Sequence, residues 1–265
     1  MTQIIGILNL TLDSFSDGGM YYNLNSAKAR IKEMINEGVD IIDIGAESTR
    51  SGFSDVRAED QINTLLPVLE FIQNECNIPV SIDTRSSEVL EAINHFDISF
   101  INDVSSGQFD DRILEIVSKI NCKYIMTFMP DEHKDGKNKE FKDILSFLKD
   151  FFQLRIDNCL TRGIKEDNII IDPGVGFGKF GKDNVTILKN LDFLKKIHPH
   201  VCIGTSNKRF SSKFFEGIET KDDLKIANLA MSSHCVLSGI SFLRVHDVDL
   251  TRDTISIISK ANSVT

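Results

Sequence analysis

The sequence lacks a paired cysteine motif, a long apolar run and an excess of basic residues. Its five cysteines are scattered and form no CxxC pair, which favours reduced thiols over a disulfide framework or a zinc site. The opening MTQIIGILNL has no basic segment, and its apolar stretch is too short for a membrane span or a signal peptide. We therefore expect a cytoplasmic protein with no membrane partner.

The charge balance and the even composition exclude further classes. A net charge of −9 argues against nucleic acid as a partner, because nucleic-acid-binding surfaces are basic. The chain also has no low-complexity linker and no shift in composition that would mark a boundary. Its 265 residues are close to the roughly 250 that are typical of one (β/α)8 barrel. We expect residues 1–265 to form one domain.

Eight short apolar runs divide the chain, and each is followed by polar or charged residues. The runs are Ile4–Leu8, Ile41–Ile44, Val80–Ile82, Phe100–Ile101, Tyr124–Ile125, Ile169–Ile171, Val201–Ile203 and Phe242–Leu243. Between them lie stretches with helical spacing of apolar residues. These are Ser26–Glu37, Glu59–Asn74, Ser86–Asn94, Arg112–Ile120, Phe141–Arg162, Val185–His198 and Leu224–Ser238. The alternation predicts an α/β fold, a single TIM barrel of the (β/α)8 type with its active site at the C-terminal ends of the strands.

A doubly wound open sheet is the main alternative fold. Such a sheet usually has a glycine-rich phosphate turn after its first strand, and Gly6–Asn9 does not fit GxGxxG. Gly176–Lys182 matches GxxxxGK, but Asp183 follows where a phosphate loop needs Ser or Thr. We interpret these glycines as allowing tight turns and the close approach of a flat ligand. The polar segment Pro130–Glu140 is expected to be a mobile surface loop.

Seven segments, in order and spanning Gly6–Val248, resemble dihydropteroate synthase. They are GILNLTLDSFSDGG, DIGAESTRSG, SIDT, INDVS, DPGVGFGK, GTSNKRF and RVHDV. The resemblance implies a magnesium-dependent transferase of folate biosynthesis. Such an enzyme joins 7,8-dihydropterin-6-ylmethyl diphosphate to p-aminobenzoate, forming 7,8-dihydropteroate and pyrophosphate. It also implies a sulfonamide target and a homodimer, to which Leu224–Ser238 would contribute.

The resemblance gives a set of residues that would bind the pterin. A pterin presents an edge of N–H donors, which a buried carboxylate can accept in pairs. Asp172 would take that part, Asp83 and Asn102 would meet neighbouring ring atoms, and Lys208 would donate to the ring carbonyl. Two further residues, Met126 and Phe177, would flank the ring. The residues expected to be catalytic are Lys208, Asp83, Asp172 and Arg244.

Further residues would hold the diphosphate, by the same resemblance. Asn9 would ligate or orient Mg²⁺ with the diphosphate, while Arg50, Arg244 and His246 would bind phosphate oxygens. Arginine suits this part because its planar group makes paired, charge-assisted hydrogen bonds. The loop Thr11–Gly19, which contains Asp13, would close over the site and exclude water.

The p-aminobenzoate end departs from the family pattern. Its expected residues are Thr49, Ser51, Ser206 and Arg209. The departures are Ser51 for a proline, Asn207 for an arginine, Thr127 for a histidine, Leu12 for a proline and Ala46 for a glycine. Two alternatives to the synthase therefore stay open, both of them pterin-binding homologues with altered or lost p-aminobenzoate use. One is a domain that serves methyl transfer, and the other is a non-catalytic pterin binder.

Overall fold

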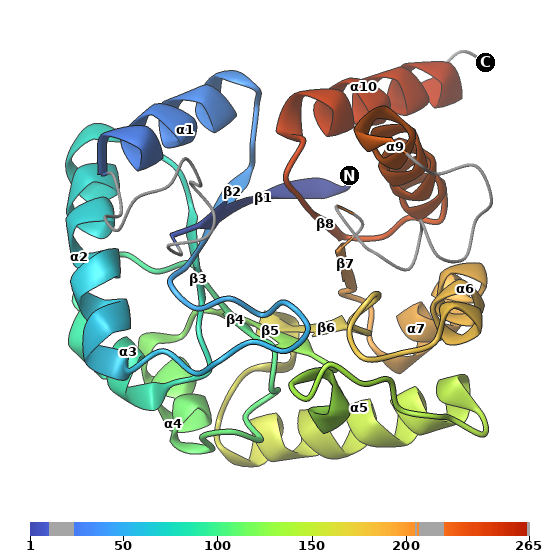
Figure 1. Cartoon of the computed structure of the whole chain (residues 1–265), viewed down its shortest axis with the longest axis horizontal. Coiled ribbons are helices and arrows are strands. Elements are labelled where there is room, and N and C mark those ends of the chain that lie inside the picture. The colour runs from blue at the N-terminus through green and yellow to red at the C-terminus, as the bar shows by residue number, and fades with distance from the viewer. Residues whose placement is uncertain (11–23, 205, 207–219, 264–265) are drawn as a thin grey trace.

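The computed structural model describes residues 1–10, 24–204, 206 and 220–263. Eight parallel strands lie at the centre, and helices surround them (Figure 1). The strands are β1 Gln3–Asn9, β2 Ile41–Gly45, β3 Val80–Asp83, β4 Phe100–Asp103, β5 Lys123–Thr127, β6 Ile169–Asp172, β7 Cys202–Gly204 and β8 Phe242–Val245. The eight predicted strands are therefore confirmed, and no end differs from the predicted run by more than two residues.

Hydrogen bonding joins the strands into one nearly closed cylinder. The order is β6-β5-β4-β3-β2-β1-β8-β7, and every pairing is parallel. The two ends of this order, β6 and β7, meet through an isolated bridge between Ile171 and Val201. The amide of Ile171 also donates to the carbonyl of His200, at 3.1 Å. The predicted (β/α)8 barrel is confirmed.

The surrounding helices follow the predicted spacing closely. They are α1 Leu24–Asn36, α2 Ala58–Glu75, α3 Ser87–Ile93, α4 Arg112–Ile120, α5 Ile144–Thr161, α6 Gly181–Lys189, α7 Leu191–Ile197, α9 Lys221–Leu237 and α10 Val248–Ser263. In the stretches that the structure describes, no helix has both the length and the apolar character needed to cross a membrane.

Three expectations about the helices and loops need correction. The predicted helix Val185–His198 is two helices, α6 and α7, which break at Asn190. Helix α10 was not predicted, and its buried residues are Val248, Thr251 and Ile255. The segment Pro130–Glu140 is not simply a surface loop. It contains the 3-10 helix η1 (Asp131–His133), and His133 within it is only 5% exposed.

The two-residue period of the strands separates two layers of packing. Outward-facing residues pack against the helices in the main core. Inward-facing residues fill the base of the barrel as a separate apolar cluster, which we call the barrel floor. The floor consists of Ile5, Ile41, Phe100, Ile125, Ile170, Cys202 and Phe242. Lys123 lies below it, with its ammonium 5.4 and 5.6 Å from the rings of Phe100 and Phe242.

The floor determines where polar side chains can enter the barrel. Two residues beyond each floor position the chain again points inward, now above the apolar layer. Those positions hold Asp43 after Ile41, Asn102 after Phe100, Asp172 after Ile170 and Arg244 after Phe242. The strands therefore place their polar residues at the carboxyl-terminal mouth of the barrel, where barrel enzymes carry their active sites.

Candidate active site

A buried polar cluster occupies the inner mouth of the barrel. Arg244 of β8 donates from Nε to Asp43 Oδ2 of β2, at 2.6 Å, and from Nη2 to Asp83 Oδ2 of β3. Asn102 of β4 donates from Nδ2 to the same oxygen of Asp43, at 3.2 Å. We call these four residues the mouth cluster. The structure thus brings together the predicted residues Asp83, Asn102 and Arg244.

Asp43 is the member of the mouth cluster that the sequence analysis missed. It is 1% exposed and binds both Arg244 and Asn102. The signal that identifies it is its spacing, because Asp43 lies two residues after Ile41 and so points to the same inner face. Strand register agrees, since Asp43 pairs with Ser81 and Gly45 pairs with Asp83.

The mouth cluster contains two carboxylates, Asp43 and Asp83, and one guanidinium, Arg244. Burial raises the pKa of Asp83 to about 7, because desolvation and the Asp43 charge outweigh the attraction of Arg244. Burial alone would lower the pKa of Arg244, but Asp43 and Asp83 raise it, so the guanidinium stays charged. The Oδ1 atom of Asp43 and the hydroxyl of Ser81 are buried without a partner among the described residues. The inner mouth therefore carries acceptor capacity that a donor-bearing ligand would satisfy.

Asp172 begins a glycine-rich turn whose polar groups bind one another and the backbone of Phe128. Its Oδ1 accepts from the amide of Gly174, at 2.7 Å. Gly174 has φ +65°, and a Cβ there would lie 2.0 Å from the carbonyl oxygen of Phe128. The Lys179 ammonium donates to the carbonyls of Phe128, Gly174 and Phe177 at 3.2, 2.8 and 3.1 Å. At Gly174 the close approach is thus to Phe128 rather than to a flat ligand, which corrects the earlier interpretation.

The two residues expected to flank a ring ligand lie in different surroundings. Phe177 is half-buried, and its ring centroid lies 5.1 Å from that of His133 in an edge-on arrangement. Met126 is fully buried in the main core. Register pairs Ile125 with Asn102 and Thr127 with Asp172, so Thr127 points inward and Met126 points away from the mouth cluster. This register does not support a contact between Met126 and a ring held at the mouth.

The loop between β2 and α2 forms one side of the barrel mouth. Glu47 is buried and binds Arg85 through two hydrogen bonds of 2.9 and 3.2 Å, and Asp55 binds the same guanidinium at 2.5 Å. Arg50 and Ser51 are exposed at the tip of this loop. The structure therefore leaves Arg50 accessible to a ligand while an ion-pair network fixes the base of its loop.

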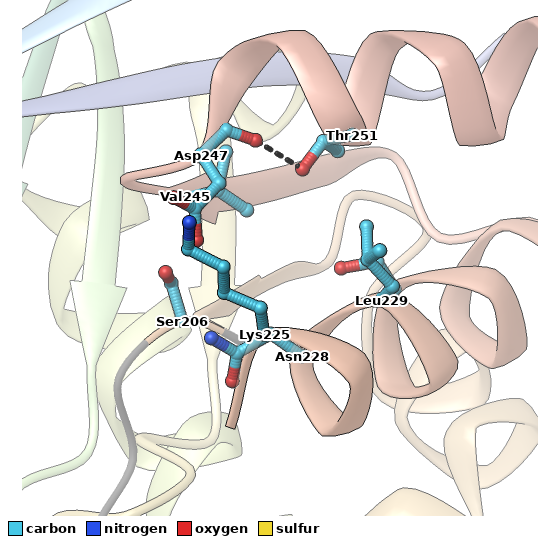
Figure 2. Close-up of a pocket in the computed structure, with 8 residues that line it drawn as sticks. Ser206, Lys225, Asn228, Leu229, Val245, Asp247 and Thr251 are labelled. Atoms are coloured by element: carbon cyan, nitrogen blue, oxygen red, sulfur yellow. Dashed lines mark hydrogen bonds between the residues drawn. The ribbon is translucent and has the colours of Figure 1, made fainter. Parts of the chain in front are cut away.

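Ser206 and His246 meet beside β8. The amide of His246 donates to the Ser206 hydroxyl at 3.2 Å, and its carbonyl accepts from Arg30 at 2.8 Å. Ser206 is 6% exposed and faces a small pocket between β8, α9 and α10 (Figure 2). The pocket is about 10 Å³ in volume, about the size of one water. Its lining includes Asn228 and Asp247.

The remaining predicted site residues include Asn9, at the end of β1, and residues that lie outside the described part of the chain. Asn9 ends β1 at the mouth, is half-buried and pairs in register with Gly45. The loop Thr11–Gly19, Lys208 and Arg209 lie outside the described residues. Within the described part of the chain, no three His, Cys, Asp or Glu side chains are grouped as ligands of a metal.

Comparison with known proteins identifies relatives of this barrel. A family described as pterin binding enzyme matches residues 5–246. The dihydropteroate synthase of Staphylococcus haemolyticus is 37% identical over 249 residues, 94% of this chain and 91% of the relative. The solved Xanthomonas albilineans dihydropteroate synthase with 4-aminobenzoic acid has a TM-score of 0.92 and 31% identity, covering 100% of this chain and 94% of that one. The Yersinia pestis dihydropteroate synthase with a sulfonamide drug has a TM-score of 0.91 and 30% identity, covering 99% and 95%.

The raised pKa of Asp83 predicts that the mouth cluster weakens the fold above neutral pH. Between about pH 4 and 7 the folded protein holds a proton on Asp83 that the unfolded chain has lost, so stability falls as pH rises through this window. Asp83→Asn removes that cost and leaves Arg244 paired with Asp43. Thermal unfolding should show Tm raised by a few degrees at pH 8 and unchanged at pH 5. An equal loss of Tm at both pH values would contradict this.

Proposed function

This chain belongs to the pterin binding enzymes and, among them, to the dihydropteroate synthases, and we propose that the mouth of its barrel binds both substrates. As a member of that family it is a transferase of folate biosynthesis. It condenses 7,8-dihydropterin-6-ylmethyl diphosphate with p-aminobenzoate, giving 7,8-dihydropteroate and pyrophosphate. The observation that carries the site proposal is the mouth cluster with Asp43 Oδ1, a buried acceptor that has no partner among the described residues.

The pterin would be held above the barrel floor. Asp172 would accept paired N–H bonds from the ring, while Asp83 and Asn102 would meet neighbouring ring atoms. Asp43 would take a further ring donor through its Oδ1 atom, because that oxygen is buried and has no protein partner among the described residues. Lys208 would donate to the ring carbonyl. Phe177 would flank the ring, as its half-buried position allows.

Arg244 would couple the pterin end of the site to the diphosphate end. Its Nε and Nη2 atoms bind Asp43 and Asp83, and a guanidinium has five N–H donors in all. Its remaining donors would meet phosphate oxygens, and Arg50 and His246 would bind the same diphosphate. As diphosphate leaves, negative charge grows on its oxygens, and fixed cations that already face them lower the barrier. The two carboxylates hold Arg244 in place for that purpose.

Magnesium would enter with the diphosphate rather than occupy a permanent protein cage. The described residues offer no grouped acidic or histidine ligands, whereas Asn9 presents one amide oxygen at the mouth. Mg²⁺ commonly keeps several waters and binds one or two protein oxygens together with substrate phosphates. A single oxygen from Asn9 fits that mode. The ion would supply charge neutralisation at the leaving group.

The p-aminobenzoate would bind beside the loop between β2 and α2. Thr49 and Ser51 lie on that loop, and Lys208 and Arg209 would face the incoming amine and its carboxylate. Ser206 would act indirectly, because it is only 6% exposed and its hydroxyl accepts a hydrogen bond from the amide of His246. Ser206 would thus help to place His246, and Arg209 would provide the charge for the carboxylate.

The chain would act as one pterin-binding domain over residues 1–265 and would pair as a homodimer. Three large apolar side chains are strongly exposed on adjacent helices. They are Ile226 and Leu237 on α9, 67% and 64% exposed, and Ile257 on α10, 68% exposed. Helices α9 and α10 pack against each other (Figure 1), so the three residues belong to one pair of neighbouring helices. A cytoplasmic location fits the five free thiols.

Turnover in the presence of Mg²⁺ tests the assignment of Asp172. Asp172→Asn should lower kcat/KM for the pterin diphosphate about 100-fold, because it removes a charge-assisted pair of hydrogen bonds. Lys208→Ala should cause a comparable loss. Asp192→Asn is the matched control, since Asp192 is a largely exposed carboxylate on α7. Pyrophosphate release that depends on p-aminobenzoate is the measurement, and unchanged rates in either site variant would refute the assignment.

Ser51 predicts a difference between substrate and drug. Without a proline ring the backbone at this position is less restricted, so a sulfonamide should lose more affinity than p-aminobenzoate. Ser51→Pro should therefore lower the inhibition constant of a sulfonamide by a larger factor than it lowers KM for p-aminobenzoate. Ser51→Ala removes the hydroxyl without restricting the backbone and should change neither. Equal factors for drug and substrate in Ser51→Pro would end this explanation.

Disrupting the exposed apolar face tests the dimer. The double variant Ile226→Lys and Leu237→Lys should elute with the mass of one chain in light scattering, because burial of two charged side chains would oppose association. Leu154→Lys serves as a control, since Leu154 is also exposed, at 60%, but lies on α5. A double variant that stays dimeric would exclude this face as the interface.

A further inference from the structure

His133 lies at the junction of two loops that border the barrel mouth. Its Nδ1 accepts from the amide of Gly178, at 2.9 Å, and its Nε2 lies 3.0 Å from the carbonyl oxygen of Thr49. A carbonyl oxygen can only accept, so Nε2 carries the proton and Nδ1 presents its lone pair. The neutral ring thus joins the loop after β2 to the loop after β6 through both of its nitrogens.

The backbone around His133 extends the same connection. The carbonyl of His133 accepts from the amide of Gly52, at 3.3 Å, so His133 contacts the loop after β2 on both sides of Arg50 and Ser51. On the other side the amide of Lys139 donates to the carbonyl of Gly178, at 2.8 Å. We call these contacts of residues 133–139 the His133 clamp. It fixes the two ends of an otherwise exposed tip.

Packing leaves little freedom at the His133 clamp. A Cβ at Gly178 would lie 2.9 Å from the Cβ of His133, so only glycine allows the two segments to come this close. The neighbouring Lys134 binds Asp55, at 2.7 Å, and Asp55 in turn binds the buried guanidinium of Arg85. The 130–140 segment is therefore tied to the loop after β2 by hydrogen bonds and by charge.

We propose that His133 is a positioning residue for the amine substrate, because it holds the Thr49–Gly52 loop in register with the Phe177 loop. The proposal rests on the proposed function, in which Thr49 and Ser51 border p-aminobenzoate and Phe177 flanks the pterin. Ser51 is exposed and has no ring to restrict its backbone, so its position depends on its anchored neighbours. The His133 clamp supplies that anchor and fixes the distance between the two substrates.

Two substitutions separate the two contacts of the ring. His133→Asn keeps an acceptor for the Gly178 amide but is too short to reach the Thr49 carbonyl. His133→Phe keeps a ring against Phe177 and loses both hydrogen bonds. Lys137→Ala is the control on the same segment, since Lys137 is 73% exposed. Comparison of His133→Asn with the unaltered protein isolates the contact with Thr49, and comparison of His133→Asn with His133→Phe isolates the contact with Gly178.

Steady-state kinetics with both substrates should show different changes in KM for the two His133 variants. His133→Asn should raise KM for p-aminobenzoate about 5- to 10-fold, the worth of one hydrogen bond, and change kcat and KM for the pterin diphosphate less than twofold. His133→Phe should raise both KM values. Lys137→Ala should match the unaltered enzyme. A wild-type KM for p-aminobenzoate in His133→Asn, or a fall in kcat with both KM values unchanged, would overturn the proposal.

Hydrogen exchange provides a readout that needs no turnover. The amide of Gly52 should exchange faster in both His133 variants and at the normal rate in Lys137→Ala, because the contacts of the clamp protect it. Unchanged exchange at Gly52 would overturn the clamp itself. If the unaltered protein releases no pyrophosphate with p-aminobenzoate, the proposed function fails, and the exchange result still judges the clamp.

Discussion

One buried guanidinium organises the mouth of this barrel. Arg244 reaches from β8 across the interior to carboxylates on β2 and β3, and Asp43 passes the connection on to Asn102 of β4. Loss of Arg244 would leave two buried carboxylates without their counter-charge, which strongly destabilises a folded protein. The last strand of the barrel is therefore held against three strands from the first half of the chain by charges that a ligand also needs. The side-chain atoms that hold these strands together are thus also the atoms proposed to bind the substrate.

The barrel floor sets the surroundings in which the charges of the mouth cluster lie. Seven inward side chains close the base of the barrel, so water reaches the polar layer from the mouth alone. The Asp83 carboxylate keeps a pKa near neutrality because it is desolvated on that floor. The chemistry of the mouth is thus a consequence of the packing below it.

Strand ends predicted most of the fold and much of the site. The eight apolar runs and their polar endings placed Asp83, Asn102, Asp172 and Arg244 at one rim, because parallel strands in a barrel all end there. Met126 shows the limit of that reasoning. A strand end does not state which of two adjacent residues points inward, and register with β4 and β6 decides in favour of Thr127. Asp43 was missed for the related reason that it lies inside its strand and not at its end.

The prediction of a surface loop for the 130–140 segment was wrong for a different reason. Its composition is polar, and polarity usually marks an exposed loop, but His133 is buried by contacts with Thr49 and Gly178 that lie 84 and 45 positions away. Local sequence carries no information about such partners.

The closure between β6 and β7 has a consequence of its own. Each other neighbouring pair of strands is joined by a ladder of three or more registered residues, whereas among the described residues a single bridge, from Ile171 to Val201, joins β6 to the chain just before β7. The cylinder therefore has a seam. Among the described residues, the fewest backbone hydrogen bonds join the wall at this point, so opening of the barrel would cost least there. The strands on either side of the seam end at Asp172 and Gly204, so the width of the mouth beside Asp172 depends on this weakly paired part of the wall.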